Sequence, residues 1–236
     1  MLPPEEIVIR PPVEANSVLI PVTGGCSWNK CTFCGSYKGI QEYAIRNFED
    51  VLNDIRYYSE LYPYAQSVFF AGGNPTSIST ESLVKIIAEA KARFKNVKRI
   101  SCYSKALDIV QKSDQELQEL YEAGLTIVYM GLETGSDKLL LKIRKGTSQS
   151  TFIKVGKRIL NSGIQLSFYV ILGIGGKEFS EEHSIETAKV INGVNPTIFR
   201  FRTLNILPNT ELWKERESGS FVELTPWECL LEEYRI

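Results

Sequence analysis

Short runs of apolar residues, rich in Val, Ile, Phe and Tyr, recur along the chain, and a longer segment with helical spacing separates each run from the next. Runs of this length and composition are typical of buried β-strands. The pattern predicts six strands, at residues 17–22, 67–71, 99–103, 126–132, 165–172 and 197–206.

The segments between these runs carry the signals of helices. Residues 47–61 and 80–94 each place their apolar side chains on one helical face. Ser113 is followed three positions later by Glu116, which is the pattern of a capping box, and Gly124 is expected to end the helix that starts there. Strands that alternate with helices pair in parallel through right-handed crossovers. Six such units form either a doubly wound sheet or an incomplete barrel.

We find no linker, low-complexity tract or solenoid repeat, so residues 1–236 are expected to form a single domain, with an N-terminal extension over about residues 1–15. Residues 226–236 are expected to form a C-terminal helix. Its apolar side chains, Trp227, Leu230, Leu231 and Tyr234, fall on one side. The helix reaches residue 236 without a helix-terminating residue, which suggests that the natural protein continues beyond it.

Composition and charge narrow the function classes. The 43% of apolar residues suffice for one large core, and 27 Lys and Arg balance 28 Asp and Glu. No basic face is implied, so a nucleic-acid substrate is disfavoured. The N-terminus carries prolines and acids instead of a signal peptide, and no apolar run approaches the ~20 residues of a membrane span. We therefore expect a soluble, cytoplasmic protein.

Three of the five cysteines, Cys26, Cys31 and Cys34, lie within nine residues of one another. An odd number of cysteines without an export signal favours metal or redox chemistry over disulfides. Cys102 and Cys229 lie alone in apolar surroundings and are expected to be buried.

Three thiolates on a glycine-containing loop suit an iron-sulfur cubane. They leave one iron without a protein ligand, free to bind a small molecule, whereas an electron carrier uses four Cys. A structural zinc site would need a fourth ligand nearby, and the sequence has none there. His183, the one histidine of the chain, is expected to be a solvated surface residue.

The segment Gly25-Cys-Ser-Trp-Asn-Lys-Cys-Thr-Phe-Cys-Gly35 resembles the cluster loop of the radical S-adenosylmethionine (SAM) superfamily, in which an aromatic residue, here Phe33, precedes the last Cys. The superfamily's common spacing is C-x3-C-x2-C, and this chain has C-x4-C-x2-C. The resemblance implies a partial (β/α)6 TIM-like barrel, a [4Fe-4S] cluster held by Cys26, Cys31 and Cys34, and SAM as cofactor.

Further motifs resemble the superfamily in the same order along the chain. Gly72-Gly73-Asn74-Pro is similar to its Gly-Gly-Glu-Pro motif, which holds the amino group of SAM through backbone carbonyls. Glu133 matches an acid at the end of the fourth strand. Lys145, twelve positions later, matches a basic residue that meets the methionyl carboxylate, which needs a fixed cationic donor when it leaves water.

Weaker correspondences complete the set, which covers about residues 15 to 215. Ser101 and Tyr103 end the third strand, where the superfamily places contacts to the ribose or the substrate. Gly173 matches a glycine at a strand end of the superfamily, where the backbone lies against the adenine of SAM. Leu207 lies in residues 206–212, which are similar to the superfamily's Pro-Gly-Thr-Pro-Leu segment.

The resemblance implies reductive cleavage of SAM to a 5′-deoxyadenosyl radical, which abstracts hydrogen from a substrate. We expect a small molecule or peptide as substrate, and a reductant such as flavodoxin or ferredoxin as partner. Three alternatives stay open: a non-catalytic iron-sulfur electron-transfer module, a zinc-stabilised binding protein, and a radical SAM enzyme that modifies RNA.

The last predicted strand carries a substrate hypothesis. Alternation sends Arg200 and Arg202 to one face and Phe199 and Phe201 to the other. If the phenylalanines pack against the outer helices, the two guanidinium groups line the barrel interior and call for an anionic partner. The opposite register would place both arginines outside, next to helix acids such as Glu182.

Overall fold

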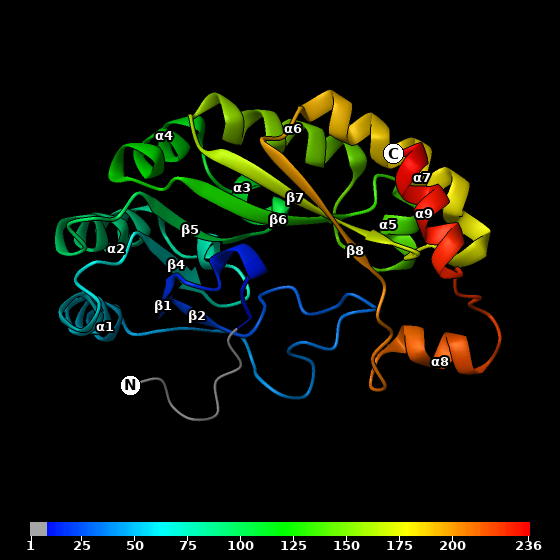
Figure 1. Cartoon of the computed structure of the whole chain (residues 1–236), viewed down its shortest axis with the longest axis horizontal. Helices are drawn as coiled ribbons and strands as arrows, with labels where there is room; N and C mark the ends of the chain where they lie inside the picture. Colours follow the sequence, from blue (N-terminus) through cyan, green and yellow to red (C-terminus); the bar gives the residue numbers. More distant parts are fainter. Residues whose placement is uncertain (1–8) are drawn as a thin grey trace.

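The computed structural model describes residues 9–236 and contains a curved sheet of six parallel strands, in the order β1-β4-β5-β6-β7-β8 (Figure 1). The strands are β1 (Val18–Pro21), β4 (Ser67–Ala71), β5 (Arg99–Ser104), β6 (Ile127–Glu133), β7 (Gln165–Leu172) and β8 (Ile198–Thr203). The sheet does not close, because β1 and β8 form its two edges. The predicted α/β fold, a partial (β/α)6 TIM-like barrel, is confirmed.

All six predicted strands are present, and their observed bounds are close to the predicted ones. The largest difference is in β8, which ends at Thr203 instead of residue 206. Its partner strand β7 ends at Leu172, which pairs with Thr203, so the residues that follow have no strand to pair with. A short antiparallel pair, β2 (Thr23–Gly24) and β3 (Ala44–Ile45), flanks the loop with the three cysteines.

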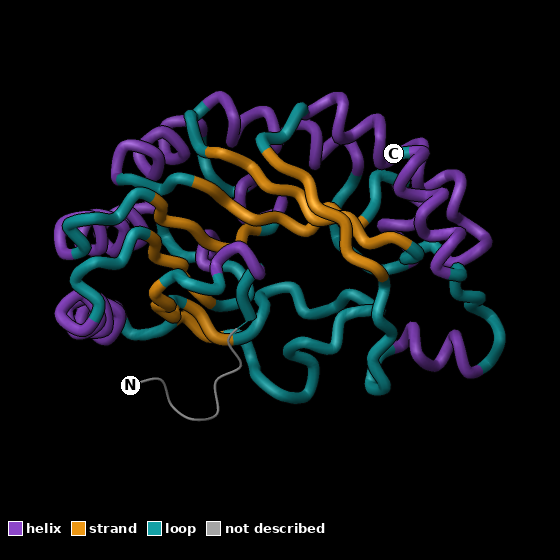
Figure 2. The backbone as a smooth tube through the Cα atoms, in the orientation of Figure 1, coloured by secondary structure: helices purple, strands orange, loops and turns teal. Residues whose placement is uncertain are grey.

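The helices between the strands lie along the convex side of the sheet, and loops occupy the opposite side (Figure 2). They are α1 (Phe48–Leu61), α2 (Thr80–Arg93), α3 (Ala106–Val110), α4 (Asp114–Ala123), α5 (Asp137–Lys142), α6 (Gln149–Asn161) and α7 (Gly176–Val194). The predicted capping box of Ser113 and Glu116 is present at the start of α4. Gly124 ends that helix with a φ of 122°, a conformation that favours glycine.

The two faces of the sheet contribute to different cores, because neighbouring side chains along a strand point in opposite directions. Phe70, Val128 and Phe168 pack outward against the helices in the largest hydrophobic cluster. Phe69 and Tyr129 point inward and belong to a smaller cluster in the barrel interior. That interior cluster is rich in aromatic rings.

The N-terminal segment covers the barrel at the amino ends of the strands. Glu14, in the 3-10 helix η1 (Pro12–Glu14), is fully buried and accepts hydrogen bonds from Ser17, Ser101 and Tyr129. Of the expected extension over about residues 1–15, the first eight residues lie outside the described part. Ser101, which was expected among the cofactor contacts, donates its hydroxyl to Glu14 over 2.9 Å.

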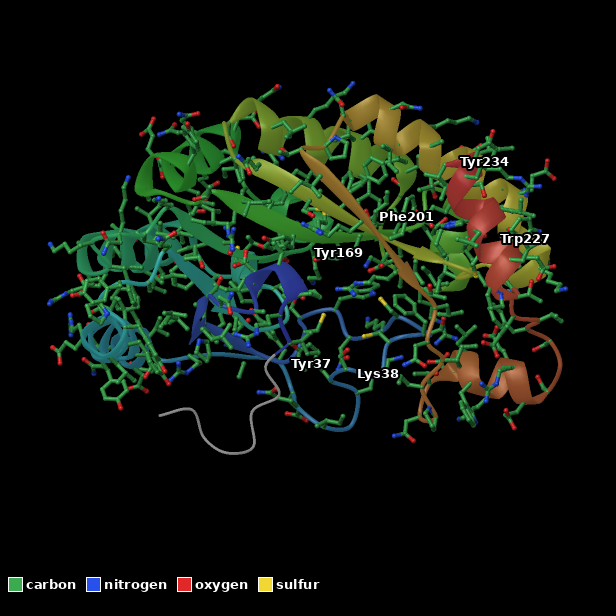
Figure 3. All side chains as sticks on the ribbon, viewed as in Figure 1. Tyr37, Lys38, Tyr169, Phe201, Trp227 and Tyr234 are labelled. Atoms are coloured by element: carbon green, nitrogen blue, oxygen red, sulfur yellow. The ribbon has the colours of Figure 1, made fainter. Side chains whose placement is uncertain are left out.

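The C-terminal helix α9 (Pro226–Arg235) forms as predicted, but its apolar side chains do not face the protein. Trp227 is 67% exposed and Tyr234 89%, and both project from the outer surface (Figure 3). The helix instead buries Cys229 and Glu232 against α7. No helix in the described part of the chain is long and apolar enough to cross a membrane.

The expectation that His183 is a surface residue is wrong. This α7 residue is fully buried, with its Nδ1 2.8 Å from the Thr134 hydroxyl and its Nε2 3.7 Å from a carboxylate oxygen of Glu232. The Glu-Glu-His-Ser sequence around it is polar, but the histidine lies on the side of α7 that α9 covers. Sequence around a helical residue does not reveal which neighbour will cover it.

Candidate functional site

The three clustered cysteines line one cavity of about 460 Å³ at the carboxyl ends of the strands. Cys26, Cys31 and Cys34 are each partly exposed, and Phe33 lines the same cavity. Cys102 and Cys229 are buried elsewhere, as predicted. Active sites of α/β barrels form at this end, where the strand ends and the following loops meet.

The arrangement suits a cluster better than a single ion. Thiolates around a tetrahedral zinc are about 3.8 Å apart, since each Zn–S bond is about 2.3 Å long. No three Cys, His, Asp or Glu side chains among residues 9–236 come together closely enough to hold one ion. A cubane is larger, and three thiolates around one open cavity leave its fourth iron free for a small ligand.

The loop makes a left-handed turn inside the C-x4-C spacing. Asn29 adopts a left-handed conformation with a φ of 47°, which asparagine tolerates better than most residues. Trp28 donates a hydrogen bond from Nε1 to the Arg144 carbonyl over 2.8 Å. Its ring lies so close to Gly146 that a Cβ there would be 2.2 Å from it. The loop is thereby attached to the segment that carries Lys145.

Glu133 and Lys145, predicted as cofactor contacts, form an ion pair in the cavity, with 2.7 Å between Oε1 and Nζ. Although burial lowers the pKa of Lys145, the neighbouring Glu133 carboxylate raises it above its usual value. Arg144, the neighbouring cation in the chain, does not line the cavity and pairs with Glu211 over 2.7 Å.

Backbone geometry positions that ion pair. Glu133 has a φ of 62°, which is rare for a residue with a side chain, and the pairing of β6 with β7 shifts register between Gly131 and Glu133. A Cβ at Gly131 would lie 2.0 Å from the Glu133 carboxylate and 2.9 Å from the Lys145 ammonium. Gly131 is therefore a site residue that the sequence reasoning missed, since glycine inside a strand has many other causes.

The Gly72-Gly73-Asn74 turn holds the cysteine loop against the end of β4. A Cβ at Gly72 or Gly73 would lie 2.1 Å from the carbonyl oxygen of Thr23 or Gly25, respectively. The Gly73 amide donates to the Gly25 carbonyl over 2.9 Å. Of the two glycines, only Gly73 lines the cavity.

Asn74 does not line the cavity, which differs from its expected role as a cofactor contact. It is fully buried, accepts a hydrogen bond from the Ser27 amide and donates its own amide to Asp108 over 2.9 Å. Asp108 also accepts a hydrogen bond from Thr76. Through the Ser27 amide, this network holds the cysteine loop against Asn74 and Asp108. Nothing in the sequence around Asp108 indicated this role.

The remaining predicted residues divide between the cavity and its surroundings. Tyr103 lines the cavity. Gly173 does not, since its amide donates to Glu232 over 2.6 Å on the side of α9. Leu207 lies outside the lining and packs beside Gly35 of the cysteine loop. Lys105, which lines the cavity near Asp108, was missed.

Arg200 and Arg202 lie on the inner face of β8, as one of the two alternatives predicted. Their partners on β7 are Tyr169 and Ile171, which both line the cavity, as does Arg202 itself. Phe201 packs against the outer hydrophobic cluster. Figure 3 shows Tyr169 and Phe201 beside the crossing of β7 and β8.

Residues 20–189 match the family model of the radical SAM superfamily, and the chain belongs to that superfamily. Its cofactors are a [4Fe-4S] cluster and SAM, which the three cysteines and the cavity beside them fit. The heme chaperone HemW of Bacillus subtilis (strain 168) is 26% identical over 213 residues, which are 89% of this chain and 54% of HemW. The chain thus spans about half the length of this relative.

Solved structures share the fold at low sequence identity. Coproporphyrinogen III oxidase HemN from Escherichia coli superposes with a TM-score of 0.66 at 15% identity, over 92% of this chain and 51% of HemN. The radical SAM methyltransferase TsrM from Kitasatospora setae, with cobalamin and a [4Fe-4S] cluster bound, gives a TM-score of 0.69 at 16% identity, over 89% of this chain and 41% of TsrM.

Proposed function

We propose that this protein is a radical SAM enzyme that cleaves SAM reductively at a cluster held by Cys26, Cys31 and Cys34. The observation that carries the proposal is the meeting of these thiolates with the Glu133–Lys145 ion pair in one cavity. When bound, the two cofactors supply a 5′-deoxyadenosyl radical that abstracts hydrogen from a substrate.

The chain's own residues bind, orient and shield the reactants. Lys145 offers a cation to the methionyl carboxylate, and the backbone at Gly73 offers a carbonyl to its amino group. Tyr103 and Phe33 contribute apolar walls that exclude water from the cavity. The substrate is a small molecule or a peptide, and an external reductant such as flavodoxin or ferredoxin supplies the electron.

Two other functions make different predictions. An iron-sulfur electron-transfer module would bind a cluster, and its activity would not depend on the Glu133–Lys145 ion pair. A heme chaperone, as the Bacillus relative is named, would bind heme. Both would leave SAM intact in the presence of a strong reductant, so product formation separates them from the proposed function.

The test is anaerobic reconstitution of the cluster, followed by dithionite, SAM and chromatographic detection of 5′-deoxyadenosine. The wild type is expected to form 5′-deoxyadenosine. Cys31→Ala is expected to lose both the EPR signal of the reduced cluster and all product, since two thiolates cannot hold the cubane stably. Cys102→Ala, which changes a buried cysteine away from the cavity, serves as the matched control and should retain both.

A Cys31→Ala variant that still produced 5′-deoxyadenosine would overturn the assignment of the cluster ligands. A reconstituted wild type that held a cluster but produced none would favour the electron-transfer module. Heme binding by such an inactive wild type would instead favour the chaperone.

A further inference from the structure

Three polar atoms on the inner face of β7 and β8 are buried without any hydrogen-bond partner among residues 9–236. They are the Ser167 hydroxyl, the Tyr169 hydroxyl and Nε of Arg200. The register pairs Tyr169 with Arg200 directly, and Ser167 lies two residues before Tyr169 on the same face. Buried polar groups are normally hydrogen-bonded, so three unsatisfied groups on one face call for an explanation.

The positive charges of Arg200 and Arg202 also have no carboxylate partner in the described part of the chain. Arg202 is exposed where it lines the cavity, and its guanidinium carbon lies 5.6 Å from the centre of the Tyr169 ring. In the part of the chain that the structure describes, no carboxylate forms an ion pair with Arg200 or Arg202. Two acids of the barrel are engaged elsewhere, Glu14 with hydroxyl donors and Arg99, and Glu133 with Lys145.

The four side chains share one chemical property. Guanidinium groups and hydroxyls all donate hydrogen bonds, and the two guanidinium groups add positive charge. A ligand that satisfies them must therefore accept several hydrogen bonds and carry negative charge. Arginine forks match the geometry of carboxylate and phosphate oxygens.

Aromatic side chains adjoin this donor group. Tyr103 lines the same cavity as Tyr169, and Phe69 packs edge-on against Tyr103 at a ring separation of 5.3 Å. Such a wall suits the apolar or aromatic body of an organic molecule. Tyr169 and Arg202 line the cavity that also contains the cysteines, and Ser167 and Arg200 lie beside them on the same face of β7 and β8. A molecule held there by its anionic end would therefore extend toward the cluster loop.

We propose that Ser167, Tyr169, Arg200 and Arg202, the β7–β8 cluster, bind the oxyanion group, carboxylate or phosphate, of an organic substrate. This proposal rests on the proposed function, because the oxyanion would orient the substrate toward the site of radical formation. The oxyanion accepts hydrogen bonds from the orphaned donors and neutralises the two guanidinium groups.

The test measures binding of small probes to the reconstituted protein by isothermal titration calorimetry. Benzoate and phenyl phosphate carry the two candidate oxyanions on an aromatic ring, and benzamide is the uncharged counterpart of benzoate. The wild type is expected to bind at least one of the two anions and not benzamide. The anion that binds with the higher affinity shows whether the site prefers a carboxylate or a phosphate.

Arg200→Met and Arg202→Met are expected to weaken anion binding at least tenfold, because methionine retains much of the side-chain volume and lacks the donors. Arg93→Met, on the outer surface of α2, is the matched control and should bind as the wild type does. Should an arginine variant fail to fold, Tyr169→Phe removes one orphaned donor without changing the charge and is expected to weaken binding severalfold.

Equal binding of benzoate and benzamide, unchanged affinity in the foldable variants, or no binding of either anion would overturn the proposal. Failure of the proposed function is seen separately, as absence of 5′-deoxyadenosine from the wild type. Anion binding that depends on Arg200 and Arg202 in a protein that does not cleave SAM would leave the oxyanion site in place and remove the radical chemistry.

Discussion

Single residues in the cavity are placed by constraints that reach beyond their own side chains. The Glu133–Lys145 pair depends on Gly131, because any side chain there would occupy the space of the carboxylate. It also depends on Trp28, which attaches the cysteine loop to the segment around Lys145. These contacts position the ion pair relative to the cysteine loop, and a binding site for one cofactor requires such fixed geometry.

Lys145→Ala is expected to weaken SAM binding by ~1.5 to 3 kcal/mol, the range for hydrogen bonds to charged groups. The loss has a second contribution, since Glu133 would then face the methionyl carboxylate without its cation. Equilibrium dialysis of the reconstituted protein measures the affinity, and visible absorbance checks that the cluster still assembles.

Arg144→Ala is the matched control for Lys145→Ala. Arg144 is the neighbouring cation, but it pairs with Glu211 outside the cavity, so its loss should leave SAM affinity unchanged. Equal affinity in Lys145→Ala and the wild type would move the carboxylate contact to another cation, such as Arg202.

At the scale of elements, α7 and α9 meet the strand ends through buried polar groups. His183 of α7 contacts Thr134 just after β6, and Glu232 of α9 accepts the amide of Gly173 just after β7. His183 and Glu232 lie 3.7 Å apart between the two helices. Their protonation therefore affects how firmly the C-terminal helix is held.

Burial lowers the pKa of His183 from 6.5 to about 4. The unfolded chain then binds a proton more readily than the folded one, so the histidine's contribution is complete above pH 6.5 and is lost as the pH falls toward 4. The expected loss is about 3 kcal/mol at pH 4. Chemical denaturation at several pH values measures it.

His183→Gln removes this titration, so the difference in unfolding free energy between wild type and variant should shrink as the pH falls from 6.5 to 4. The comparison is needed because Glu232 acts in the opposite sense. Burial raises the pKa of Glu232, so its contribution to stability is lost as the pH rises through that pKa. A pH-independent difference would mean that His183 is not buried as a neutral group.

At the scale of the whole molecule, Glu14 connects the N-terminal segment to the middle of the open barrel. Burial raises the pKa of this carboxyl group, but hydrogen bonds from Ser17, Tyr129, Ser101 and Arg99 outweigh it and lower the pKa below its usual value. The Glu14 carboxylate thus accepts hydrogen bonds from Ser17, which follows η1, from Ser101 and Arg99 of β5, and from Tyr129 of β6.

Glu14→Gln is expected to destabilise the protein by about 3 kcal/mol, because the amide presents its own donors to groups that need an acceptor. Urea denaturation, followed by circular dichroism, measures the change. Glu119→Gln, on the exposed side of α4, is the matched control and should change stability by less than about 0.5 kcal/mol. Similar stabilities for the two variants would contradict the role of Glu14.

Much of the fold was predictable because it depends on local patterns. Buried parallel strands need continuous apolar runs, and helix ends need caps such as Ser113 with Glu116, so both appear in the sequence itself. The bounds of β8 were less predictable, since a strand ends where its neighbour ends. The exposed side of α9 could not be predicted either, because periodicity defines an apolar face without saying what covers it.

The grouping of the three cysteines around one cavity was the most predictable part of the site, since they lie within nine residues on one loop. Glu133, Lys145 and Tyr103 were found through the order of motifs along the chain. Asn74 shows the limit of such matching, because its match to a motif carried no information on where its amide points.

The amino-acid sequence by itself determined the strands and helices, the cysteine loop and the alternation of Arg200 with Phe201, because backbone preferences and side-chain periodicity act over a few residues. Only the tertiary structure decided that the arginines face inward, that His183 and Glu232 are buried together, and that Glu14 and Asp108 bind donors from distant segments. These outcomes depend on which surfaces meet when the sheet curves, and a buried polar group takes whichever partner the packing brings within hydrogen-bonding distance.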